Sequence, residues 1–140
     1  MAEVFAFEIH TPYRRFFSGD IETLVVTLSD GESAIYAYHS FFIAPVVTSI
    51  LKIKNKKGEW LSACISDGIL EVKGHNTILL VEAAEWPQEI DLARAQAAEK
   101  SALERMSSSS FKPDFMSACA ALKRAQTRIK ACNIAGHAGA

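Results

Sequence analysis

The 140-residue sequence predicts a small antiparallel β-sandwich or barrel followed by a two-helix hairpin. Up to Trp86, short apolar runs alternate with turn residues at the spacing typical of antiparallel β folds. After Ile90, the apolar residues recur at the helical period of about 3.6, in a segment rich in alanine. The change of period predicts a sandwich over residues 1–86, a hairpin over 87–135 and a flexible tail over 136–140.

The first half is expected to consist of short strands joined by tight turns. In its first segment, Phe5, Phe7 and Ile9 alternate with smaller or polar residues, as in a strand with one buried face. The segments with strand character are 4–10, 21–28, a segment after residue 31, 49–54, 59–65, 69–73 and 77–82. The expected turns, marked by glycine, serine, asparagine and aspartate, are 16–20, 29–31, 55–58, 67–68 and 74–76.

The second half is expected to form two helices. Asp91 precedes a run of good helix formers over residues 92–106, and its carboxylate can cap the first turn. The serines and Pro113 in 107–114 are expected to end this helix, and a second helix is predicted over 115–132. Apolar residues at alternating spacings of four and three predict a seam at Ala118, Leu122, Ala125, Ile129 and Cys132. Because alanine buries little apolar area, the hairpin is expected to be weakly held and movable.

Composition excludes several classes of function. The 15 basic and 16 acidic residues nearly cancel, which argues against a nucleic-acid partner. No apolar run approaches the ~20 residues needed to cross a bilayer, so we expect a cytoplasmic chain without direct membrane insertion. The three cysteines lack CxxC spacing and are expected to be buried thiols. The four histidines are scattered, and no phosphate-loop or nucleophile motif occurs, so neither a metal site nor a catalytic residue is expected.

One segment has a strongly uneven charge. From Phe115 to the end of the chain there is no acidic residue, while four basic residues crowd the second predicted helix: Lys123, Arg124, Arg128 and Lys130. The charge run is consistent with a solvated helix face or with a docking surface for acidic protein or phosphate.

Several short motifs occur in an order and spacing typical of one family. They are Phe17-Ser18-Gly19, Val26-Thr27, Asp30-Gly31-Glu32, His39, Gly68 to Val72, Ala84-Glu85, Ile90 to Ala95 and Leu122 to Ala125. With these motifs the chain resembles, over about residues 3–132, the ε subunit of bacterial F-type ATP synthases.

The resemblance implies a non-catalytic rotor protein on the cytoplasmic face of the cell membrane, peripheral to it. The sandwich is expected to bind the γ subunit and the polar loops of the membrane c-ring. The helical hairpin is expected either to fold up or to extend along γ toward the catalytic α and β subunits, where the extended form blocks ATP hydrolysis. The inhibitory docking surface is then expected at Leu122, Lys123, Arg124, Arg128 and Lys130.

The resemblance also assigns rotor contacts: Glu32, His39, Phe41 and Phe42. Glu32 matches the acidic residue that approaches the c-ring, and the segment 41–43 is either an apolar patch for γ or part of the core. The chain departs from the family pattern at Ala34, Ala37, Tyr38 and Phe41, where glycine and proline are usual. Tyr38 is therefore expected to change the path of its loop if that path needs positive φ.

The same resemblance implies ATP as a regulatory ligand, because some family members hold ATP in the folded hairpin. No cofactor is expected to be required. The matching positions are Glu85, Ile90, Asp91, Arg94, Ala95, Arg124 and Arg128. Arginine forks suit phosphate oxygens. Ser101 replaces a further arginine of strong binders, which predicts modest affinity. The structural alternative is that Asp91 only caps the helix and Arg94 is only a surface residue.

The runner-up hypothesis is a free-standing nucleotide-sensing module, and a hydrolase on a small β-barrel is a distant third. Co-purification with γ at a fixed ratio separates the first two, because a soluble sensor has no reason to bind γ.

Overall fold

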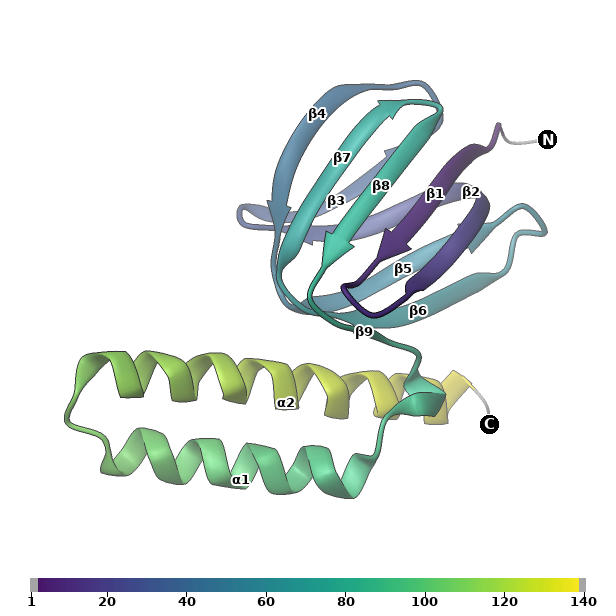
Figure 1. The fold of residues 1–140 in the computed structure, drawn as a ribbon. Coiled ribbons are helices and arrows are strands. Elements are labelled where there is room, and N and C mark those ends of the chain that lie inside the picture. The colour runs from purple at the N-terminus through teal and green to yellow at the C-terminus, as the bar shows by residue number, and fades with distance from the viewer. Residues whose placement is uncertain (1–2, 139–140) are drawn as a thin grey trace. The chain divides into compact units, whose positions relative to one another are not determined.

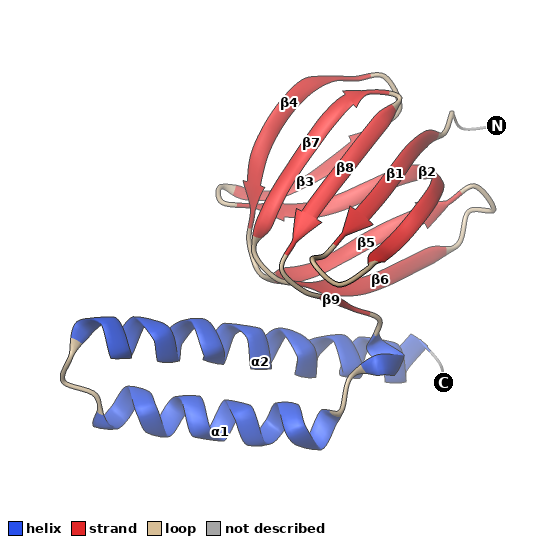
Figure 2. Ribbon diagram, viewed as in Figure 1, coloured by secondary structure: helices blue, strands red, loops and turns tan. Residues whose placement is uncertain are grey.

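The computed structural model describes residues 3–138, which form a unit of strands followed by a unit of helices (Figures 1 and 2). The chain divides into these two compact units between Glu85 and Trp86. The strands are β1 (Phe5–His10), β2 (Arg15–Leu28), β3 (Gly31–Tyr36), β4 (His39–Val46), β5 (Ser49–Asn55), β6 (Trp60–Ile65), β7 (Gly68–Gly74), β8 (Asn76–Val81) and β9 (Ala84–Glu85). The helices are the 3₁₀ turn η1 (Pro87–Glu89), α1 (Leu92–Ser108) and α2 (Lys112–Ala138). The predicted fold class, a β-sandwich followed by a two-helix hairpin, is confirmed.

The strands form two layers that share one continuous path of hydrogen-bonded neighbours. The order is β1-β8-β7-β4-β2-β5-β6-β9, β3 pairs with β2, and β1 also pairs with β2. All pairings are antiparallel except β1 with β8, which is parallel. Figure 1 shows β4, β7, β8 and β1 in one layer and β3, β5 and β6 in the other, and β2 runs from its pairing with β1 into its pairing with β3 and β5. The alternating apolar residues of both layers fill the space between them, as the period of two predicts.

The core confirms the alternation expected for the first strand. Phe5, Phe7 and Ile9 are buried, while the residues between them are half-buried. The other layer contributes apolar side chains such as Leu24 and Ile53, which are also fully buried. The first unit therefore has a hydrophobic core of its own.

The turn expected at residues 16–20 was wrong, because these residues lie inside the 14-residue strand β2. The chain turns earlier, where the backbone N–H of Thr11 donates to the Arg14 carbonyl at 3.0 Å. Ser-Gly-Asp has little strand propensity of its own, but Gly19 pairs with Phe7 of β1. The Phe17 ring lies 5.9 Å from the Phe7 ring, so pairing and packing override the local turn signal.

The segment after residue 31 forms two strands joined by the turn Ala37–Tyr38. Tyr38 has φ 64, the only positive value among the non-glycine residues that the structure describes. Tyr38 thus adopts a positive φ despite its bulk, and the expected departure of this loop from the family's usual path stays a prediction. The Tyr38 ring packs edge-on against His75, with centroids 4.5 Å apart, and its hydroxyl lies 3.4 Å from a Glu3 carboxylate oxygen. These contacts hold Tyr38 in a backbone conformation that is unusual for a bulky residue.

The helices of the second unit are longer than predicted. α1 ends at Ser108, where the hydroxyls of Ser107 and Ser108 donate to carbonyls three residues back. α2 begins at Lys112, because Pro113 in the first turn has no N–H to leave unpaired. α2 runs to Ala138, so residues 136–138 of the expected tail are helical, and residues 139–140 lie outside the described part of the chain.

The two helices pack against each other as a hairpin. Ala118 and Ala125 of the predicted seam are buried, as are Ala95 and Ala102 of α1. Leu122, Ile129 and Cys132 of the seam are half-buried. The residues buried deepest along the seam are thus alanines, while larger apolar residues at the turn, such as Phe111 and Met116, are exposed. None of the helices within residues 3–138 is both long and apolar enough to span a bilayer.

Two further expectations can be compared with the described residues. None of the three cysteines, all within the described residues, forms a disulfide; Cys64 is buried, while Cys119 and Cys132 are half-buried. Within residues 3–138 no group of three or more histidine, cysteine and acidic side chains could hold a metal ion.

Candidate functional site

The expected nucleotide residues gather mainly at the base of α1. The chain enters this helix through η1, where the Trp86 N–H donates to a Glu89 carboxylate oxygen at 2.9 Å and Ile90 N–H donates to the Pro87 carbonyl at 3.3 Å. Asp91 is the N-cap of α1, as predicted, and its Oδ1 accepts from the backbone N–H of Arg94 at 3.1 Å. Four of the seven residues, 90, 91, 94 and 95, thus lie within one turn of the helix start.

The two arginines of α2 lie on the other arm of the hairpin. η1 packs against α2, which places the base of α1 beside the C-terminal part of α2 (Figure 1). Arg124 is exposed and Arg128 is half-buried, and at 100° per residue both lie to one side of the alanine seam. Asp91 and Arg94 are exposed, whereas Ala95 is buried. Glu85 belongs to the first unit, where it ends β9 and is half-buried. The role of these residues in nucleotide binding stays a prediction.

The basic residues of α2 form two rows on the side away from the seam. Lys123 and Lys130, seven positions apart, make one row, and Arg124 and Arg128, four apart, make the other. Lys123, Arg124 and Lys130 are exposed, and no ion pair is found for these three within residues 3–138. The helix therefore presents cationic groups whose counter-charges come from outside the hairpin.

The expected rotor contacts occupy two places in the sandwich. Glu32 is exposed at the start of β3, opposite Thr27 of β2, whereas His39 begins β4 beyond the far end of β3. His39 lies beside Phe42, with the two rings 5.0 Å apart. The structure thus brings His39 and Phe42 together and separates Glu32 from both. A single partner surface that touches all of them must extend along β3.

Phe41 and Ile43 lie on an exposed apolar face, whereas Phe42 stands opposite the buried Val72 and faces the core side. A register shift between His39 and Phe42 turns Phe41 outward, and Phe41 is 62% exposed while Phe42 is half-buried. Further apolar residues point the same way from β4, β7 and β8, and Pro45, Ile69 and Leu80 stand side by side across the three strands. We call this set the outer apolar face: Phe41, Ile43, Pro45, Ile69 and Leu80.

The sequence did not predict that Ile69 and Leu80 lie on the outer surface. Both lie in apolar runs without alternation, Ile69-Leu70 and Leu79-Leu80-Val81, in which apolar residues occupy both faces of the strand. Such runs are consistent with an outward face that a partner covers. Ile69 and Leu80 are 52% and 54% exposed within this chain.

Comparison with known proteins gives the family. Residues 4–87 match the family described as "ATP synthase, Delta/Epsilon chain, beta-sandwich domain", and residues 88–133 match "ATP synthase, Delta/Epsilon chain, long alpha-helix domain". The chain therefore belongs to the delta/epsilon chain family of ATP synthases.

Similar proteins of known name are epsilon chains of ATP synthases. The ATP synthase epsilon chain of Caldanaerobacter subterraneus subsp. tengcongensis is 43% identical over 131 residues, which cover 93% of this chain and 94% of the relative. The epsilon chain of Clostridium novyi is 41% identical over 93% of this chain and 98% of its own length. The epsilon-subunit resemblance that the motifs predicted is thus confirmed.

Solved structures share the fold at much lower identity. A chain of the Euglena gracilis mitochondrial ATP synthase, in a structure of OSCP, F1 and the c-ring, has a TM-score of 0.80 at 16% identity, covering 89% of this chain and 78% of that one. A chain from the central stalk and c-ring of the Tetrahymena thermophila enzyme has a TM-score of 0.67 at 15% identity, covering 94% and 98%.

Proposed function

We propose that this chain is a non-catalytic rotor subunit of an F-type ATP synthase, which couples the c-ring to γ and restrains ATP hydrolysis. Family membership supports this function. In the proposal the sandwich binds γ and the c-ring, and the helical hairpin reaches the catalytic α and β subunits. The complex sits on the cytoplasmic face of the cell membrane, with this chain peripheral to it.

The outer apolar face is the observation that carries the proposed γ contact. Three of its large residues, Phe41, Ile43 and Ile69, are more than half exposed on neighbouring strands. A contiguous apolar patch of this kind on a folded domain marks a protein interface, because exposing it to water is unfavourable. The face includes the expected contact Phe41, so γ is its proposed partner. In this proposal Glu32, at the other end of β3, contacts the c-ring.

The basic rows of α2 support the proposed restraint on hydrolysis. Lys123, Arg124, Arg128 and Lys130 supply four positive charges, and no acidic residue follows Asp114 in the sequence. Each exposed ion pair contributes only ~0–1 kcal/mol, so an effective brake requires several pairs together with burial of Leu122. The proposal is that these residues dock against acidic surface of the catalytic subunits.

ATP is the proposed regulatory ligand of the hairpin. The support is the cluster at the base of α1 next to the arginine-bearing arm of α2. A ligand that binds only the compact hairpin stabilises that form and thereby withdraws the brake. The affinity is modest in this proposal, because Ser101 offers no guanidinium.

Reconstitution tests the whole proposal. The full-length chain is added to an ATP synthase lacking this subunit, and subunit stoichiometry and ATP hydrolysis are measured. We expect one copy to assemble per γ and hydrolysis to fall. A chain that does not bind γ, or that binds without altering hydrolysis or coupling, would contradict the proposed function.

A further inference from the structure

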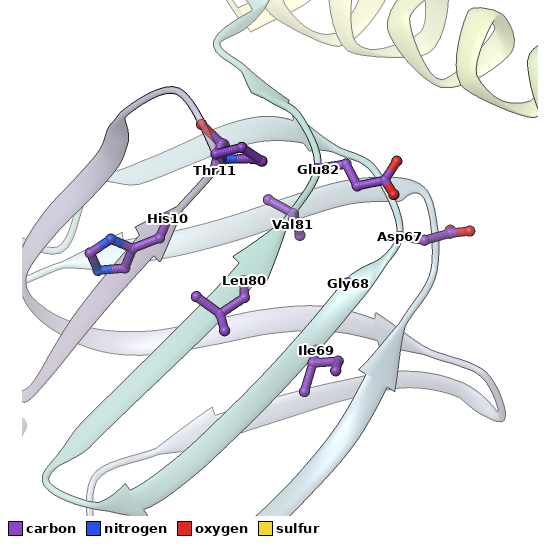
Figure 3. A pocket seen from close by; sticks show the side chains of 9 residues that line it. His10, Thr11, Asp67, Gly68, Ile69, Leu80, Val81 and Glu82 are labelled. Carbon is purple, nitrogen blue, oxygen red and sulfur yellow. The ribbon is translucent and has the colours of Figure 1, made fainter.

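A recess lies at one edge of the outer apolar face, within the first unit. It has a volume of about 530 Å³ and an apolar floor formed by Ile69, Leu80 and Val81. Figure 3 shows His10 and Thr11 on one side of this floor and Asp67 and Glu82 on the other. The recess is therefore apolar at its base and carries two carboxyl groups along one rim.

The pairing of β1, β8 and β7 builds the floor. Leu80 stands opposite Ile69 on one side and opposite His10 on the other, so three side chains line up across the strands. Gly68 pairs with Val81, and a Cβ at Gly68 would stand 2.0 Å from the Leu80 carbonyl oxygen. Only glycine allows β7 to start so close to β8, which fixes the floor at this end.

Asp67 of the acidic rim is held in place, and the rim has no basic partner among the residues that the structure describes. Oδ1 of Asp67 accepts from the backbone N–H of Thr48 at 2.7 Å and from its hydroxyl at 2.9 Å. Neither Asp67 nor Glu82 forms an ion pair with any residue that the structure describes. His10, across the floor, lies 3.5 Å from Glu8 instead. The rim thus offers two exposed carboxylates to a cation supplied by a partner.

We propose that the recess is the anchor point for a γ segment in which a large apolar side chain lies next to a lysine or arginine. The apolar side chain fills the floor over Ile69 and Leu80, and the cation meets Asp67 and Glu82. The floor is continuous with the outer apolar face, so the partner proposed for that face is also the proposed occupant of the recess, and the acidic rim requires a basic residue in the bound segment. This inference rests on the proposed γ contact of that face.

Binding of purified γ to full-length variants tests the anchor. Leu80→Ser should weaken binding roughly tenfold because the apolar contact is lost. Glu82→Gln should weaken it roughly threefold and make it less sensitive to salt. The matched controls are Leu61→Ser on the other layer and Asp20→Asn, an exposed acidic residue on β2, and both should stay within about twofold of the unchanged chain.

A third variant separates the two levels of the proposal. Phe41→Ser alters the outer apolar face outside the recess and should weaken γ binding. If Phe41→Ser weakens binding while Leu80→Ser and Glu82→Gln do not, the recess is not an anchor and the proposed function stands. If the unchanged chain does not bind γ, the proposed function itself fails.

Crosslinking identifies the occupant directly. A photoreactive residue placed at position 80 of the chain, in the assembled ATP synthase, should crosslink to γ, and the crosslinked peptide should carry a lysine or arginine beside an apolar residue. Crosslinks confined to the chain's own helices, to the c-ring or to a second copy would overturn the inference.

Discussion

Asp91 and Arg94 are joined at the base of α1 through the backbone: Oδ1 of Asp91 accepts from the Arg94 N–H at 3.1 Å. The cap therefore requires the carboxylate of Asp91 but not the guanidinium of Arg94, which is exposed. The structural role of Asp91 and any ligand-binding role of Arg94 can be tested apart, because different atoms carry them.

The first prediction concerns the cap. Asp91→Ala should lower the stability of the helical unit by about 1 kcal/mol, because the first turn of α1 loses an acceptor. Asp91→Asn keeps a side-chain oxygen and should cost much less. Hydrogen exchange of the α1 amides measures both. Equal protection in all three chains would mean that the cap contributes nothing to the helix.

The second prediction concerns the nucleotide. ATP should bind the full-length chain and raise its melting temperature, with a gain of ~2.7 kcal/mol at a hundredfold excess over Kd. Arg94→Gln and Arg124→Gln should each weaken binding, because a guanidinium fork is lost. Lys123→Gln, a charge change in the other basic row, serves as the control. No heat and no thermal shift at millimolar ATP would leave Asp91 and Arg94 with structural roles only.

The third prediction concerns the basic rows. Replacing Lys123, Arg124, Arg128 and Lys130 together with alanine should raise ATP hydrolysis by the assembled enzyme, as should deleting the chain after Ser110. Single replacements should have small effects, since each exposed pair contributes at most ~1 kcal/mol. The restraint should also weaken as salt screens the charges. Identical hydrolysis with full-length, four-alanine and truncated chains would show that the helices have no regulatory role.

The fourth prediction concerns the sandwich. Residues 1–86 should fold alone and bind γ, because the first unit has its own core and the outer apolar face lies within it. Circular dichroism and a γ binding assay check the two parts separately. A truncated chain that folds but does not bind γ would move the γ contact to the helices.

The fifth prediction concerns the start of β7. Gly68→Ala should destabilise the sandwich by about 1–3 kcal/mol or more, because the new Cβ would stand 2.0 Å from a backbone oxygen of β8. Gly19→Ala is the matched control, since its Cβ would meet the Phe17 ring at an ordinary 3.6 Å. Chemical denaturation of the two variants gives the comparison. Equal stability would mean that β7 and β8 can separate at little cost.

The sequence predicted the fold because its two periods are clear. The alternation of Phe5, Phe7 and Ile9 requires a strand, and the spacing of the seam alanines requires a helix. The structure has a strand and a helix at these places. The turn wrongly expected at 16–20 shows where local propensity fails. Gly19 and its neighbours have turn character, but their partners in β1 are distant in sequence and cannot be inferred from composition.

The candidate sites were predictable only where a motif carries them. The base of α1 was located by its family motif, and Asp91 also by its capping character. Ile69 and Leu80 were missed, because an apolar run does not tell which residue faces the core. That assignment depends on the register of β7 with β8, which aligns Ile69 with Leu80 and leaves both outside.

The path of strand β2 through both layers has a mechanical consequence for the sandwich. Its first half pairs with β1 and its second half with β3, so one continuous backbone serves both layers of the sandwich. A force applied to one layer is carried to the other through covalent bonds, without depending on side-chain contacts that can slip. In a body that turns with a shaft, such a strand lets the two layers rotate as one piece under load.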